Sequence, residues 1–307
     1  MATPATKMVE AYLIMAQKRT KKPMRPGTAG RVRRVLLKFL RDTEIGDARD
    51  ITLAAIQAWI ARLNRNSPDT RHGYARALHT FVGYLIRQQV VRIDLHKFEI
   101  PERAAVGRKN WLKLDVANRV IADAKDQDLA FILYCGFHAG LRKSEIIAAK
   151  VNWFDLGDGL LHVQNDPGSG FILKDADNRV IPLSPDFKEF LTSYLARRDP
   201  DSYALRPGDK GGKAEYRYDF RKVLRSHFNR CGVKCTTHDM RRSFASNLVS
   251  LSTSVYKVAR WLGDGVAVVE KSHGNLAPAD RDIDVLSTPA RSPGSSTTSK
   301  AFADGAL

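Results

Sequence analysis

Apolar positions in the first 90 residues recur three or four places apart, which is the spacing of side chains on one face of an α-helix. The last of these stripes follows Ser67-Pro68, a pair that favours a helix start because serine caps free N–H groups and proline fits the first turn. The pattern predicts four helices, built around the apolar stripes of residues 9–16, 32–40, 53–63 and 74–85.

The periodicity ends after Val91. Residues 98–110 contain a proline and a glycine but no apolar repeat, so we expect a linker between two domains there. Helical spacing returns at Asp115, which we expect to be an N-cap, and restarts at Lys143 and after Ser184-Pro185. Further helices are expected over residues 129–139, 216–229, 238–248 and 254–262.

Strand-like segments interrupt the helices of the second domain. Asp158-Gly159 marks a turn, and the short apolar segments around it predict strands over residues 160–163, 171–173 and 179–183. The expected fold class is therefore mainly α with a small β-hairpin or sheet (α+β). The expected domains are a helical domain over 1–104, an α+β domain over 105–285 and a disordered polar tail over 286–307.

Positive charge is concentrated in the first third of the chain. Residues 1–110 hold 22 Lys and Arg against 9 Asp and Glu, a net of +13 out of +17 for the whole chain. This excess is larger than solubility requires and favours a polyanionic partner, above all the phosphate backbone of nucleic acid. The candidate phosphate-binding side chains are Arg31, Arg33, Arg34, Lys38, Arg71 and Arg76.

Composition argues against several classes of protein. The three cysteines are too few for a disulfide framework, no secretory apolar segment opens the chain, and the longest uncharged apolar stretch, 129–141, is shorter than the roughly 18 residues of a membrane span. We therefore expect no membrane association and a cytoplasmic, nucleoid-associated protein. Cys231, Cys235 and His238 form only a weak zinc pattern, so no metal is expected.

The sequence contains no GxxxxGK[ST], GxGxxG, HExxH or GxSxG motif. A metal-free reaction at phosphorus would instead need fixed cations to balance the charge of a pentacovalent phosphate. Candidate cations occur in three places. Arg142 starts a helix in GLRKSE with Glu145 one turn later, Lys174 ends a predicted strand, and His238 and Arg241 stand three places apart on one helical face.

The order of these motifs points to a family. Four features together resemble the tyrosine recombinase, or phage integrase, family: GLRxSE, a strand lysine eight residues before Pro182, HDMRRSFAS and WLGD (residues 261–264). The resemblance is strong from about Gly136 to Pro278, and the N-terminal region looks like the core-binding domain of that family in helix number and charge. It implies a core-binding domain and a catalytic domain that close as a clamp around double-stranded DNA.

The resemblance also implies roles for individual residues. Arg142 and Arg241 match the arginines that hold the scissile phosphate, and Glu145 matches the acidic residue that supports the first of them. Lys174 matches the lysine that protonates the leaving 5′ oxygen, and His238 matches the histidine that assists proton transfer at the nucleophile. The family cleaves and rejoins strands through a 3′-phosphotyrosine, without metal or other cofactor. It works as a homo-oligomer, a tetramer on two DNA sites. The intact set of cations implies integration or excision of a mobile element as the ancestral role.

Two positions depart from the family pattern. Asp264 stands where the family usually has histidine or sometimes tryptophan, and a carboxylate there adds negative charge near the phosphate. His273 stands where the nucleophilic tyrosine is expected, in the segment KSHGNL. No tyrosine follows Tyr256, which is out of register for this role.

Three accounts of His273 are open. The chain is a degenerate recombinase that binds DNA without cutting it, the histidine is a single change in an otherwise active enzyme, or His273 itself attacks phosphorus. The third account is disfavoured, because imidazole reaches about 2 Å less far than a phenol and about 1 Å of misplacement costs roughly a hundredfold in rate. A non-enzymatic DNA-binding regulator on the same scaffold is the alternative function.

Overall fold

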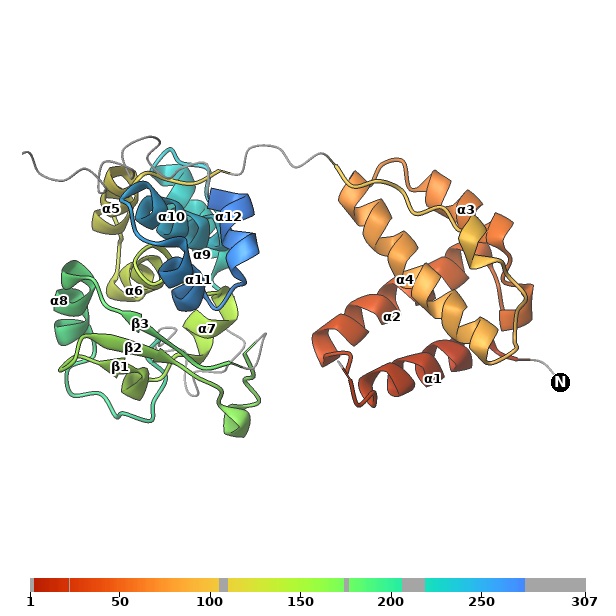
Figure 1. The fold of residues 1–307 in the computed structure, drawn as a ribbon, viewed down its shortest axis with the longest axis horizontal. Helices are drawn as coiled ribbons and strands as arrows, with labels where there is room; N and C mark the ends of the chain where they lie inside the picture. The colour runs from red at the N-terminus through yellow and green to blue at the C-terminus, as the bar shows by residue number, and fades with distance from the viewer. Residues whose placement is uncertain (1–2, 22, 105–109, 174–176, 206–218, 274–307) are drawn as a thin grey trace, which may run out of the picture. The chain divides into compact units, whose positions relative to one another are not determined.

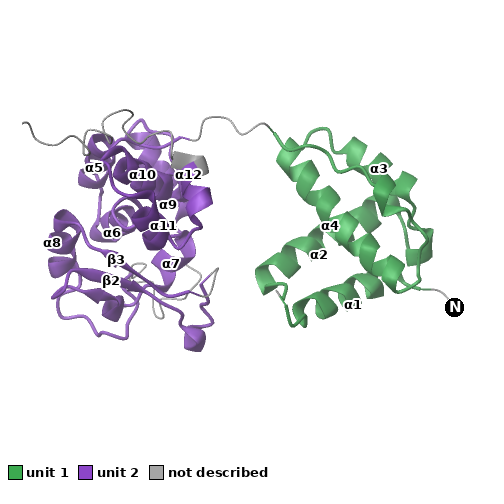
Figure 2. Cartoon of the chain, viewed as in Figure 1, with its two compact units in different colours: residues 1–107 green, residues 108–307 purple. Residues whose placement is uncertain are grey.

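The computed structural model describes residues 3–21, 23–104, 110–173, 177–205 and 219–273, with the backbone alone for 271–273. The chain divides into two compact units, residues 1–107 and 108–307, which Figure 2 colours separately. Each unit has its own apolar core. The tail predicted over 286–307 lies outside the described residues.

Unit 1 is helical, as its apolar stripes predict. It contains α1 (Ala5–Gln17), α2 (Pro26–Thr43), α3 (Leu53–Arg62) and α4 (Pro68–Arg87), with 3₁₀ turns at Ala48–Asp50 and Leu95–Lys97. α1 packs on α2 and α4, and α3 packs on the same two helices (Figure 1). The apolar faces meet in a core that includes the fully buried side chains of Leu36, Phe39, Ile56, Leu78 and Phe81.

Local sequence explains where these helices begin. The Ser67 hydroxyl accepts the Thr70 N–H at the start of α4, and the Thr52 hydroxyl accepts the Ala55 N–H at the start of α3. The expected N-cap at Ser67-Pro68 is therefore confirmed.

Unit 2 combines helices with a small sheet. Its elements in chain order are α5 (Leu114–Ala122), α6 (Gln127–Phe137), α7 (Lys143–Ala148), β1 (Phe154–Asp155), β2 (Leu160–Val163), β3 (Arg179–Pro182), α8 (Pro185–Tyr194), α9 (Arg221–Arg230), α10 (Thr237–Ser250), α11 (Val255–Leu262) and α12 (Val266–His273), with 3₁₀ turns at Val151–Trp153 and Pro167–Ser169. α10 packs against α5, α6, α11 and α12, and α11 also contacts β3 (Figure 1). The expected mainly α fold with a small sheet is confirmed.

The sheet joins the helices through its buried face. Its strands have the order β1-β2-β3 with antiparallel neighbours. Leu161 pairs with Ile181 and Val163 pairs with Arg179, and all four side chains are buried, whereas Val180 is exposed. An arginine thus occupies an inward position of β3, beside the apolar core.

The strand prediction is wrong at one place and incomplete at another. Residues 171–173 do not form a strand, because Phe171 makes only an isolated bridge with Asp166 across a 3₁₀ turn. The two-residue strand β1 escapes prediction, since two residues carry no readable alternation.

Two helix starts differ from expectation. Asp115 is not an N-cap: α5 begins one residue earlier with Lys113 in the cap position, and Asp115 lies in the first turn, where its charge complements the helix dipole. Ser184 does precede α8, but no side-chain capping bond forms, and the Ser184 hydroxyl pairs with Nδ1 of His138 at 2.8 Å.

The C-terminal helices also differ in extent. The helix expected over 216–229 is α9, which starts at Arg221, and residues 216–218 lie outside the described part. α12 has no counterpart in the prediction, because its valine-rich start has low helix propensity. Within the described residues, no helix is long and apolar enough to cross a membrane.

Candidate functional site

The loop between α6 and α7 positions the first arginine of the site. Gly140 has φ +60°, a left-handed conformation that glycine adopts without strain, and a Cβ there would lie 2.6 Å from Phe244 and 2.9 Å from Leu262. The glycine therefore allows α10 and α11 to approach the loop. Arg142 takes the N-cap position of α7, where its backbone N–H donates to Glu145 Oε2 at 2.8 Å and its Nη1 donates to Glu145 Oε1 at 3.1 Å.

Glu145 is the buried anion of the site, with a side chain that is 1% exposed. Arg179 of β3 donates to both of its oxygens, from Nη1 at 3.1 Å and from Nη2 at 2.6 Å. Burial raises the pKa of Glu145, but the Arg179 hydrogen bond and charge, the Arg142 N–H and the Arg241 charge together hold this pKa below its usual range. Glu145 is therefore ionised at neutral pH and binds Arg142 and Arg179 at once.

Arg241 reaches the same place from α10. Its side chain is 4% exposed, and it donates from Nη1 to the Gly140 carbonyl at 2.7 Å and from Nη2 to the Leu262 carbonyl at 2.6 Å. Burial, and then the nearby charge of Arg142, lower the pKa of Arg241. The guanidinium nevertheless remains protonated, as arginine does in proteins.

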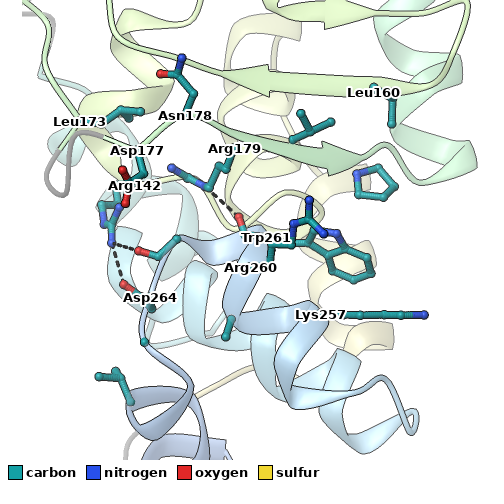
Figure 3. A pocket seen from close by; sticks show the side chains of 16 residues that line it. Arg142, Leu160, Leu173, Asp177, Asn178, Arg179, Lys257, Arg260, Trp261 and Asp264 are labelled. Atoms are coloured by element: carbon teal, nitrogen blue, oxygen red, sulfur yellow. Dashed lines mark hydrogen bonds and ion pairs between the residues drawn. The ribbon is translucent and has the colours of Figure 1, made fainter.

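The turn after α11 places a carboxylate between the two arginines. Gly263 ends α11 with φ +62°, and Asp264 follows it. Asp264 Oδ1 accepts from Arg142 Nη2 at 2.7 Å, and Asp264 Oδ2 accepts from Arg241 Nη2 at 2.7 Å. Figure 3 shows Arg142 directed toward Asp264.

These contacts define an arginine cluster, consisting of Arg142, Arg179, Arg241, Glu145 and Asp264. Its three guanidinium groups and two carboxylates leave one positive charge. Two guanidinium groups that converge on one small anion can bind a phosphate with charge-assisted hydrogen bonds. The cluster therefore has the chemistry of a phosphate-binding site.

A cavity of about 920 Å³ opens beside the cluster (Figure 3). Its walls come from β2, β3, α11 and α12. Among the described residues, the charged side chains that line it are Arg142, Asp177, Arg179, Lys257, Arg260 and Asp264. This basic excess favours an anionic ligand.

His238 lies at the surface in the first turn of α10, three places before Arg241, as the sequence predicts. Desolvation, followed by the positive charges of Arg242 and Arg241, lowers its pKa. The imidazole is therefore neutral at neutral pH, which is the form that accepts a proton.

Two predicted site residues cannot be placed by their side chains. Lys174 lies outside the described residues; its nearest described neighbours, Leu173 and Asp177, both line the cavity. His273 is the last residue of α12, and its backbone alone is described.

Cys231, from the weak zinc pattern, contacts other residues than Cys235 and His238. Cys231 Sγ lies 3.7 Å from His227 Nε2 and 3.9 Å from Asp123 Oδ2. In the part of the chain that the structure describes, no three His, Cys, Asp or Glu side chains are grouped so that they could hold a metal ion.

The basic residues predicted in unit 1 lie on two helices. Arg31, Arg33, Arg34 and Lys38 belong to α2, and Arg71 and Arg76 belong to α4. Two of them form ion pairs: Arg33 with Glu10 at 2.7 Å and Lys38 with Asp42 at 2.5 Å. The Arg33 pair is exposed on both sides, so it contributes little to stability and leaves the arginine accessible.

Arg179 is the site residue that sequence reasoning missed. Its side chain is 5% exposed, and besides binding Glu145 it donates from Nε to the Trp261 carbonyl at 2.8 Å (Figure 3). It therefore ties the loop of Arg142 and the turn of Asp264 to the sheet. A signal existed, because Arg179 shares the inward register of β3 with Ile181, and an arginine at an inward position needs a buried partner.

Comparisons with known proteins agree with the motifs. Residues 110–263 match the model of the phage integrase family. The tyrosine recombinase XerC of Pseudomonas aeruginosa is 25% identical over 245 residues, which cover 75% of this chain and 78% of that protein. The tyrosine recombinase XerA of Thermococcus onnurineus is 30% identical over 148 residues, which cover 47% of this chain and 49% of that protein.

Solved structures share the fold. The Tn1549 transposon integrase in complex with transposon right end DNA aligns with a TM-score of 0.69 at 14% identity, over 92% of this chain and 98% of that one. A lambda integrase dimer bound to a core site aligns with a TM-score of 0.66 at 14% identity, over 89% of this chain and 79% of that one. The family match spans half of the chain and includes Arg142, Glu145, Arg179 and Arg241. The chain therefore belongs to the phage integrase family, the tyrosine recombinases.

Proposed function

We propose that the chain binds duplex DNA and presents one of its phosphodiesters to the arginine cluster. Its scaffold is that of site-specific strand cleavage and rejoining in the integration or excision of a mobile element, and His273 at the place of the nucleophile impairs this reaction. The observation that carries this proposal is the convergence of Arg142 and Arg241 on a single carboxylate, each at 2.7 Å. A phosphodiester offers two anionic oxygens to the same donors. Burial of Arg241 strengthens its interaction with an anion, because solvent screens the charge less.

The proposed chemistry needs no metal. In the family reaction a tyrosine oxygen forms a bond to phosphorus as the bond to the 5′ oxygen breaks, so the strand is held as a 3′-phosphotyrosine and a free 5′ hydroxyl. Arg142 and Arg241 would balance the charge of the pentacovalent phosphate. Neutral His238 would accept the proton of the nucleophile, and Lys174 would donate one to the leaving 5′ oxygen.

Unit 1 would bind the DNA backbone. Its sequence carries most of the excess positive charge of the chain, and the Tn1549 and lambda integrase structures are described in complex with DNA, which supports duplex DNA as the partner. A homotetramer on two DNA sites and a location on the nucleoid complete the proposal.

His273 favours one second candidate, a DNA-binding regulator that does not cut. The segment KSHGNL has histidine where the family has its nucleophile. Such a protein would keep the DNA-binding surface and the arginine cluster but form no covalent intermediate.

Selection from a pool of random duplexes tests the DNA-binding part of the proposal. Full-length protein is incubated with the pool, bound DNA is recovered and sequenced over several rounds, and single-stranded DNA and RNA serve as competitors. A shared duplex motif and weak competition by single strands are expected. Equal binding of duplex, single strand and RNA would contradict the proposal.

A further inference from the structure

Asp264 occupies the position between Arg142 and Arg241 that the proposed function gives to a phosphate. Each of its oxygens accepts a hydrogen bond from the Nη2 atom of one arginine, both at 2.7 Å. The same two Nη2 atoms also donate to the carbonyls of Gly263 and Leu262. A carboxylate bound in this way uses donors that a phosphate would need.

The fold delivers this carboxylate to the arginines. Gly263 adopts the left-handed conformation that ends α11, and a Cβ there would lie 3.1 Å from Arg179 Cδ. The Asp264 N–H donates to the Ala259 carbonyl at 3.1 Å, which closes the turn. The turn that carries the carboxylate is thus closed by a backbone hydrogen bond that does not involve the carboxylate oxygens.

Charge explains why a carboxylate is favoured there in the free protein. Glu145 pairs with Arg142 and Arg179, and the charge of Arg241 acts on it as well. These four groups carry two net positive charges without Asp264 and one with it. The charge of Arg142 already lowers the pKa of Arg241, so the two guanidinium groups repel each other. An anion between them relieves this repulsion, and either Asp264 or a phosphate can supply it.

We propose, on the basis of the DNA-binding function above, that Asp264 is an internal competitor for the DNA phosphate. Its carboxylate holds Arg142 and Arg241 in the free protein and leaves them when a phosphodiester binds. Its side chain is 26% exposed, so it has an open path to solvent. The residue thereby lowers the affinity of the site and makes phosphate binding depend on a movement of the Asp264 side chain away from the two arginines.

Asp264→Asn tests the proposal, with Asp158→Asn as the matched control. Asp158 is exposed in the turn between β1 and β2 of the same unit, and the change removes the same charge from a residue outside the arginine cluster. Binding of a labelled duplex of mixed sequence is measured by fluorescence anisotropy at low salt. We expect Asp264→Asn to bind on the order of tenfold more tightly than the parent, and Asp158→Asn to stay within about twofold.

Two further measurements separate competition from a simple charge effect. The gain from Asp264→Asn should disappear in an Arg142→Gln background, because the competition requires that arginine. Without DNA, Asp264→Asn should melt at a lower temperature than Asp158→Asn, since the arginines lose their anion. Inorganic phosphate should raise the melting temperature of Asp264→Asn more than that of Asp158→Asn. Asp264→His provides a second variant with the same expected gain in affinity.

The outcomes distinguish this inference from the proposed function. If the parent binds duplex DNA but the Asp264 variants bind it no more tightly than Asp158→Asn, the competition by Asp264 is refuted and the proposed function stands. Weaker binding by the Asp264 variants also overturns it, because the carboxylate would then position the arginines for DNA. Absence of duplex binding by the parent and all variants contradicts the proposed function itself.

Discussion

Arg179→Met removes the buried partner of Glu145 and tests whether the sheet holds the loop of Arg142 in place. The substitution leaves a carboxylate that is 1% exposed without its two hydrogen bonds from Arg179, at 3.1 and 2.6 Å. It also leaves the Trp261 carbonyl without the Arg179 Nε–H. Arg142 still contacts Glu145, but from a side chain that is 20% exposed and shared with Asp264.

Removing one partner of a buried ion pair costs about 3–5 kcal/mol, because the other charge stays buried without compensation. With a loss of about 4 kcal/mol and a urea dependence of about 2.5 kcal/mol per molar, the unfolding midpoint should fall by about 1.6 M. Urea titration followed by tryptophan fluorescence measures this shift, since Trp111, Trp153 and Trp261 belong to unit 2.

Arg221→Met is the matched control. Arg221 also contacts both oxygens of a carboxylate, that of Asp219, but its side chain is 70% exposed. Because solvent screens this pair, its loss should leave the midpoint near that of the parent. Adding Glu145→Gln to Arg179→Met should restore part of the lost stability, since the buried carboxylate that lost its partner is then neutral. Equal midpoints for Arg179→Met and Arg221→Met would refute this reasoning.

Three further predictions follow from charge. The affinity for duplex DNA should fall steeply with salt concentration, with a log–log slope of about −4.5 or steeper for about five or more phosphate contacts. Deleting residues 1–104 should abolish most of this affinity. A slope shallower than about −3 would contradict the role of unit 1. Arg142→Lys and Arg241→Lys should each weaken duplex binding about tenfold in anisotropy titrations, because lysine cannot donate two parallel hydrogen bonds as a guanidinium does. If both arginines contact one phosphate, the double variant should lose less affinity than the product of the two single losses. Burial lowers the pKa of His138 below its ordinary value, so the unfolded chain binds a proton at a higher pH than the folded chain does. The free energy of unfolding should therefore be highest above about pH 6.5 and fall as the pH drops below this value. His138→Gln should make Tm depend less on pH.

Helix periodicity predicts much of this fold because each helix of unit 1 has a continuous apolar stripe. The stripes of unit 1 correspond to α1–α4, and Ser67 caps α4 as its sequence suggests. The failures lie where tertiary contacts override local pattern. Phe171 is buried, so its segment is as apolar as a strand, yet its backbone pairs only with Asp166.

The site is readable from sequence only in part, for a related reason. Arg142 and Glu145 are close in sequence, so their ion pair follows from helical spacing. Arg179 and Asp264 enter the cluster through contacts that span 34 and 122 residues, with Glu145 and Arg142 respectively. No local pattern encodes such distances, and they become visible once β3 and the turn after α11 are placed.

Covalent trapping on DNA tests the central claim, that the arginine cluster is a strand-cleavage site, most directly. The parent and His273→Tyr are incubated with nicked duplexes that carry the selected motif. After cleavage, the short fragment with the free 5′ hydroxyl diffuses away from the nicked duplex, and adducts are resolved on a denaturing gel. Arg142→Ala in the His273→Tyr background is the control for dependence on the cluster.

We expect no adduct from the parent and a phosphotyrosyl adduct from His273→Tyr that Arg142→Ala abolishes. An acid-labile, alkali-stable adduct from the parent would instead make His273 the nucleophile. No adduct from His273→Tyr, despite tight binding of the selected duplex, would contradict the cleavage site and leave the DNA-binding regulator as the function of the chain.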